Sequence, residues 1–109
     1  MKAISIQEPW ASMILSGLKT IETRKWQTSY RGKILLCASK KPVSKISGYA
    51  FAIAELVEIM PMTKEHEKQA CCEVYPGAYS WFLKNIKQIP LFPVEGKLSL
   101  FDVEVKDGY

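Results

Sequence analysis

Residues 4–26 read ISIQEPWASMILSGLKTIETRKW, and this stretch sets the expected order of the first three elements. The weak alternation of residues 1–7 predicts a strand. In EPWASMILSG, Pro9 suits a first helical turn and Gly17 suits the left-handed residue that closes a helix of about two turns. KTIETRKW returns to a period of two, which predicts a second strand beginning near residue 19.

The second predicted strand carries more charges than a small core normally accepts. Glu22 and Arg24 lie two positions apart, so their side chains should share one strand face at a spacing of roughly 7 Å. An arginine fork can hold a phosphate, whereas a glutamate accepts a hydrogen bond from an amine or ring N–H of a base. The pair therefore either holds a nucleotide-like ligand or forms a salt bridge without one, which at a surface contributes only about 0–1 kcal/mol.

Lys19 belongs to the turn after the predicted helix and, by alternation, to the strand face opposite Glu22, together with Thr23. It is interpreted either as a second cation for a ligand, with a catalytic role as the less favoured option, or as a solvated turn lysine. Trp10, at the start of the helix, could stack on a base or belong to the core. Gln7 could offer its amide to a base edge or cap the helix.

The rest of the chain predicts four more strands and one more helix. Expected strands occupy KILLCAS (33–39), YAFAIAELVEIM (49–60), AYSWFLKNIKQI (78–89) and LSLFDVEV (98–105). The expected helix is polar, TKEHEKQACC (63–72), with Thr63 as its cap and His66 as a solvated residue. Short antiparallel strands favour an α+β fold, a small, partly closed β-barrel with two or three short flanking helices, whose closure removes exposed sheet edges.

Composition narrows the class of protein. A length of 109 residues with 48% hydrophobic residues fits a single domain spanning residues 1–109. The apolar runs are far shorter than the roughly 20 residues of a membrane span, and residues 1–10 do not resemble a signal peptide, so we expect a cytoplasmic protein. Three cysteines and one histidine match no zinc pattern, and we expect neither metal nor cofactor.

Basic residues are concentrated in the first part of the chain. Residues 1–45 contain nine Lys and Arg residues against two acidic residues, whereas residues 46–109 contain six against nine. This asymmetry favours a surface that faces a polyanion such as nucleic acid, although folding can also mix the two parts into an ordinary solvated surface. Lys40 begins the basic loop KKPVSKISG (40–48), which suits phosphate contacts or simple solvation.

The same residues carry a family resemblance. Gly17, Lys19, Glu22 and Arg24 complete a G-x-K-x-x-E-x-R motif that, behind a PWA-type helix start, resembles the ASCH domain family. The resemblance continues through YRGKILLCASK, GYAFAIAELVEI, YSWFLKNI and PVEGKLSLFDV and so covers nearly the whole chain. It implies a PUA-like barrel that binds RNA or a nucleotide in a cleft lined by the motif, with Gln7, Trp10, Lys19, Glu22, Arg24 and Lys40 as the candidate ligand-binding residues.

A hydrolase acting through the same cleft is the alternative. One bacterial branch that this chain resembles hydrolyses acetylated cytidine with a lysine, a threonine three positions later and a glutamate in a later helix. Lys19 matches, but Glu22 and Ala70 occupy the other two positions. A ribonuclease could instead use Lys19 and Glu22 as acid and base, with Arg24 stabilising the phosphorane. A third possibility is a protein-interaction domain that binds a peptide or metabolite.

Overall fold

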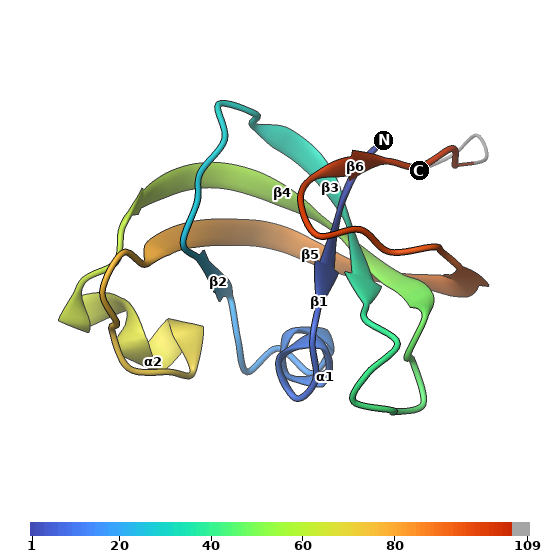
Figure 1. The fold of residues 1–109 in the computed structure, drawn as a ribbon, viewed down its shortest axis with the longest axis horizontal. Helices are drawn as coiled ribbons and strands as arrows, with labels where there is room; N and C mark the ends of the chain where they lie inside the picture. Colours follow the sequence, from blue (N-terminus) through green and yellow to red (C-terminus); the bar gives the residue numbers. More distant parts are fainter. Residues whose placement is uncertain (106–109) are drawn as a thin grey trace.

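The computed structural model describes residues 1–105 and arranges six strands in one mixed sheet (Figure 1). The sheet order is β2-β5-β4-β3-β1-β6. The strands are β1 (Lys2–Ile6), β2 (Ile21–Arg24), β3 (Gly32–Ala38), β4 (Tyr49–Pro61), β5 (Tyr79–Pro93) and β6 (Phe101–Asp102). The short helical segments are α1 (Trp10–Leu15), the 3-10 turn η1 (Lys64–His66) and α2 (Glu67–Ala70). The predicted α+β class is therefore confirmed, and the predicted domain end at residue 109 lies outside the described residues.

One strand is longer than expected: β5 continues to Pro93, whereas β4 matches its predicted range to within one residue. β4 contains 13 residues and β5 contains 15, and they pair antiparallel along most of their length. Their register shifts at three places, and Asn85 in β5 adopts a left-handed backbone conformation with φ of 51°. Such bulges increase the local twist and bend a sheet. The long ribbon therefore curves, and β2 pairs with one end of it through residues 79–82.

The sheet does not close, which corrects the expectation of a barrel without edges. β1 pairs parallel with β3 and antiparallel with β6, whereas β2 pairs only with β5 among the strands described. β6 is also shorter than the predicted strand 98–105 and pairs with only Lys2 and Ala3. The second half of β1 and the free side of β2 therefore remain unpaired with each other. We call the space between these two strands the seam.

α1 forms because local contacts support both of its ends. The Glu8 carboxylate accepts hydrogen bonds from the backbone N–H and hydroxyl of Ser12. At the other end Gly17 has φ of 87°, as predicted, and the Leu18 N–H donates to the Met13 carbonyl, which satisfies a carbonyl of the last turn. The helix contains only six residues, so it also depends on packing against the sheet.

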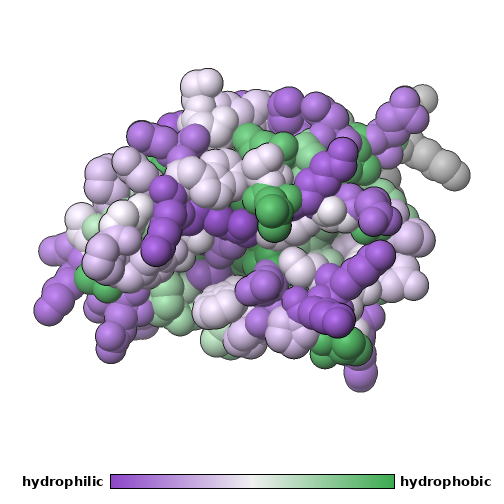
Figure 2. All heavy atoms as spheres, in the orientation of Figure 1, coloured by the Kyte–Doolittle hydropathy of each residue, from purple (hydrophilic) through white to green (hydrophobic). Residues whose placement is uncertain are grey.

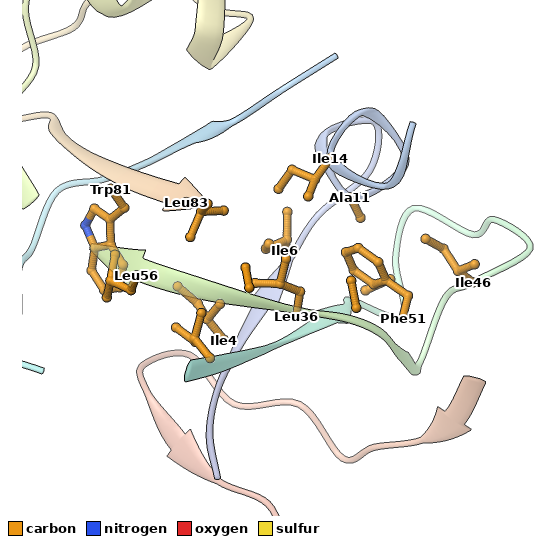
Figure 3. Packing of buried hydrophobic residues seen from close by; sticks show 14 of the residues in the cluster. Ile4, Ile6, Ala11, Ile14, Leu36, Ile46, Phe51, Leu56, Trp81 and Leu83 are labelled. Atoms are coloured by element: carbon orange, nitrogen blue, oxygen red, sulfur yellow. The ribbon is translucent and has the colours of Figure 1, made fainter. Parts of the chain in front are cut away.

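The main core lies between α1 and the concave side of the sheet. Figure 3 shows Ile14 of α1 pointing toward Ile6, and Ala11 of α1 pointing toward Phe51. All four are at most 1% exposed. Burying an isoleucine or leucine of this kind is worth about 1.5–3 kcal/mol, so the core fixes α1 beside β1 and β3.

Over the face seen in Figure 2, mainly hydrophilic side chains surround a few hydrophobic groups near the centre.

The segment around α2 differs from the predicted polar helix. Thr63 does cap it, through a capping box with His66, but the helix is split into η1 and α2 and ends at Ala70. His66 is half-buried: its ring meets Phe82 edge-on at 5.0 Å, and its Nδ1 lies 2.9 Å from the Ser80 hydroxyl. The interpretation of His66 as a solvated residue was therefore wrong. Within residues 1–105, no helix is long and apolar enough to cross a membrane.

Candidate functional site

A cavity of about 510 Å³ opens at the seam. β1 and β2 both contribute to its walls, together with the start of α1, the loop after α2 and the segment before β6. Its lining residues are Ser5, Gln7, Trp10, Lys19, Glu22, Thr23, Arg24, Ser39, Cys72, Tyr75, Lys97 and Leu98. The structure thus brings together five of the six residues predicted to bind ligand, and only Lys40 lies elsewhere.

Glu22 is the centre of the charge network in this cavity. Its Oε2 accepts hydrogen bonds from Arg24 Nε at 3.2 Å and from Arg24 Nη2 at 2.8 Å. Its Oε1 lies 3.6 Å from Lys19 Nζ. The predicted shared face for Glu22 and Arg24 is therefore present. The two residues pair with each other, and the pair also lines an open cavity, so the two interpretations of the sequence are not exclusive.

Lys19 lies next to Glu22 and is almost fully buried, with 1% of its side chain exposed. Its ammonium group donates to the main-chain carbonyl of Ala70 at the end of α2. The alternative interpretation of Lys19 as a solvated turn lysine was therefore wrong, and its assignment to the strand face opposite Glu22 does not apply. The reason is local: β2 begins only at Ile21, so the alternation does not extend back to Lys19. Burying an ammonium without such partners would cost several kcal/mol.

Arg24 links the two strands of the seam. Its Nη2 donates to the Ser5 carbonyl of β1 at 2.6 Å, in addition to its bond to Glu22. Ser5 belongs to the part of β1 that extends beyond the pairing with β6. Among the hydrogen bonds of residues 1–105, Arg24 Nη1 has no partner, and 19% of the side chain is exposed. Nη1 is therefore a donor available to a ligand.

Aromatic and hydroxyl groups form the other parts of the rim. Trp10 is half-buried: it packs against the core, as one of the two sequence interpretations expected, and it also lines the cavity. The Tyr75 hydroxyl donates to Thr23 Oγ1 at 2.9 Å. Thr23 was expected on the face away from Glu22, yet it reaches the cavity because the cavity surrounds the free side of an edge strand.

Lys40 lines a second, smaller cavity of about 260 Å³ that adjoins the first. The two cavities share Ser5, Ser39, Lys97 and Leu98. Cys37 lies at the base of the second cavity, where burial raises the pKa of its thiol to about 12, so the group stays neutral at physiological pH. Within residues 1–105 no cluster of three or more His, Cys, Asp or Glu residues could hold a metal ion.

Seven residues of the cavity were not among the predicted ligand-binding residues: Ser5, Thr23, Ser39, Cys72, Tyr75, Lys97 and Leu98. The last four lie in loops that follow α2 and β5, far from the motif in sequence. The YPG turn at residues 75–77 and the EGK turn at 95–97 indicated loops. Nothing in their pattern indicated which strands these loops would approach.

Comparison with known proteins identifies the family. A model of the ASCH domain matches residues 4–92. The chain belongs to the ASCH domain family. This family is associated with RNA binding. Human activating signal cointegrator 1 is 42% identical over 40 residues, and the mouse protein is 40% identical over 38 residues. These matches cover 36% and 35% of this chain but only 7% and 6% of the cointegrators, so the chain spans a small part of those relatives.

Solved structures show the same fold. The crystal structure of ASCH from Zymomonas mobilis aligns with a TM-score of 0.74 at 19% identity, covering 94% of this chain and 87% of that one. A point mutant of the same bacterial protein aligns with the same TM-score and identity and is covered to 89%. This ASCH domain therefore has the PUA-like α+β fold, and its sheet is open where the sequence predicted a partly closed barrel.

Proposed function

We propose that this ASCH domain binds RNA or a nucleotide and that the base enters the cavity at the seam. The observation that carries the proposal is the position of Glu22 and Arg24 side by side in an open cavity, with Arg24 Nη1 still available. Adenine and cytosine present an exocyclic amine beside a ring acceptor. Such an edge would donate to the Glu22 carboxylate and accept from the Arg24 guanidinium.

Size and surroundings support the same ligand class. The volume of about 510 Å³ lies within the range of about 300–1,000 Å³ that is common for small-molecule sites. Trp10 and Tyr75 line the cavity, and stacking of a base on an aromatic ring is worth about 1–3 kcal/mol. Lys19 and Arg24 together outweigh the single charge of Glu22, which leaves the site net positive toward a phosphate.

Titration of the isotope-labelled chain with the four nucleoside monophosphates tests this function. We expect amide shifts at residues 19–24 and at Trp10, with at least one base preferred. Arg24→Lys keeps the charge but loses the fork, and we expect it to bind at least about tenfold more weakly, which corresponds to about 1.4 kcal/mol. Arg31→Lys, at an exposed position that lines neither cavity, is the matched control and should bind as the parent does.

Two results of this titration would contradict the proposal. Nucleotides that shift no residue of the seam would show that the cavity is not their site. Equal losses of affinity in Arg24→Lys and Arg31→Lys would show that only total charge matters.

The hydrolase alternative uses the same residues and is distinguished by turnover. Lys19 and Glu22 lie 3.6 Å apart, but Lys19 already contacts the Ala70 carbonyl, and the Ala70 side chain supplies no acid or base. Incubation with RNA and with acetylated cytidine, using Glu22→Gln as control, should release no product if the domain only binds. Product formation by the parent chain and its loss in Glu22→Gln would favour the hydrolase.

A further inference from the structure

We propose that the second cavity holds a neighbouring nucleotide, so that the domain binds single-stranded RNA of two or more nucleotides along one continuous groove. This inference rests on the proposed function of the first cavity. It adds a second subsite and selects an oligonucleotide over an isolated nucleotide as the ligand.

The two cavities adjoin each other, since four residues line both of them: Ser5, Ser39, Lys97 and Leu98. The segment 94–98 passes close over β1 at this junction. A Cβ built on Gly96 would lie only 2.6 Å from the Ser5 hydroxyl, so glycine is what permits this approach. The close passage places Lys97 and Leu98 at the boundary between the cavities, next to the position of a linking phosphodiester.

The charges around the second cavity suit a phosphate. Lys97 and Lys40 line it, and Lys41 and Lys45 are exposed on the same loop as Lys40. The acidic residue there is Glu95, whose Oε2 lies 3.9 Å from Lys40 Nζ with both side chains more than two-thirds exposed. An exposed pair of this kind is worth about 0–1 kcal/mol, so Lys40 can exchange Glu95 for a phosphate at little cost.

Apolar side chains lie next to these charges, which distinguishes this site from one that binds only an inorganic anion. Leu98 is 96% exposed at the shared boundary, and Val94 is half-buried in the second cavity. An exposed leucine gains contact area when a base lies against it. A cation and an apolar side chain next to each other match the phosphate and base of one nucleotide. An acidic peptide would use the lysines but leave Leu98 uncovered.

Affinity measured against ligand length tests the second subsite. Calorimetry on the full chain compares the four nucleoside 5′-monophosphates with the sixteen 5′-phosphorylated ribodinucleotides. We expect the best dinucleotide to bind at least about tenfold more tightly than the best mononucleotide. Lys97→Ala and Lys40→Ala should each lower that ratio about threefold or more, and each lost phosphate contact should reduce the salt slope by about 0.7. Lys87→Ala removes the same charge from an exposed position outside both cavities and should keep the ratio.

The possible outcomes of these affinity measurements distinguish the second subsite from the proposed function of the first cavity. Mononucleotides that bind the seam as tightly as dinucleotides would overturn the second subsite and leave the proposed function standing. Ligands that bind nowhere near the seam would overturn both. An equal fall in ratio for Lys87→Ala, or full displacement of the dinucleotide by an equimolar acidic peptide, would show a nonspecific anionic surface and overturn the inference. Circular dichroism of each variant checks that these substitutions at exposed positions leave the fold intact.

Discussion

The two sides of the groove contain ion pairs of opposite character. On the β2 side, Glu22 lies between Lys19 and Arg24, and its side chain is 10% exposed. On the side of segment 94–98, Lys40 and Glu95 meet at 3.9 Å with 71% and 87% of their side chains exposed. The buried network is further tied to the backbone carbonyls of Ala70 and Ser5, whereas both side chains of the Lys40–Glu95 pair are largely exposed.

This difference in burial suggests different roles for the two sides: one in discriminating between bases and the other in binding the nucleic-acid backbone. Groups fixed by burial and several hydrogen bonds hold their geometry before a ligand arrives, so they can distinguish one base edge from another. Exposed lysines hold a ligand through charge, which tolerates any sequence and weakens with salt. The β2 side should therefore determine base preference, and the segment 94–98 with loop 40–48 should determine affinity for the backbone.

The largest expected effect comes from removing the centre of the buried network. Glu22→Ala leaves the Lys19 ammonium buried with only the Ala70 carbonyl, and we expect the free energy of unfolding to fall by about 3–5 kcal/mol. Urea denaturation followed by tryptophan fluorescence measures it. Glu22→Gln, which can still accept from Arg24, should lose less. A fall below about 1 kcal/mol for Glu22→Ala would mean that the network adds little to stability and that the two sides do not differ as described.

An intermediate effect is expected at the junction between the two sides. Gly96→Ala brings a methyl group against the Ser5 hydroxyl, and we expect a loss of about 1 kcal/mol in unfolding free energy. The Ser5 hydroxyl is buried and has no hydrogen-bond partner within residues 1–105, so Ser5→Ala alone should be neutral or slightly stabilising. The double variant should recover at least half of the loss. Additive effects in the same denaturation assay would show that the segment does not rest on Ser5.

The smallest effect is expected at the exposed pair. Glu95→Ala should change the unfolding free energy by less than about 0.5 kcal/mol, because both partners remain solvated in its absence. The Glu95→Ala substitution should instead change the affinity for the oligonucleotide, because Lys40 loses its acidic partner. Stability changes comparable to those of Glu22→Ala would contradict the contrast between the two pairs.

Much of the fold was predictable because local patterns agree with the final arrangement. The period of two around Glu22 and Arg24, the left-handed Gly17 and the strand at 49–60 were all confirmed. Closure was not predictable, because it depends on the bulges that curve β4 and β5 and on the short length of β6. These are properties of pairing between distant segments, and no single stretch of sequence encodes them.

The site was predictable only where it follows the motif. Glu22 and Arg24 were placed correctly relative to each other, but the burial of Lys19 depends on the Ala70 carbonyl, 51 residues away in sequence. Tyr75 and Lys97 arrive at the cavity on loops whose direction is set by the strands before and after them. Strand alternation gave no indication that Thr23 would also line the cavity, because alternation describes the faces of a sheet and not the free side of an edge strand.

The bond from Arg24 to the Ser5 carbonyl has a consequence for how this molecule behaves in concentrated solution. An unpaired strand offers its main-chain groups to any extended chain, and proteins that expose one tend to associate edge to edge. Here a charged, bulky guanidinium occupies the acceptor of β1 that an incoming strand would need. Replacing Arg24 with a small neutral residue would therefore uncover a docking place for other copies, so aggregation should accompany the loss of this single side chain.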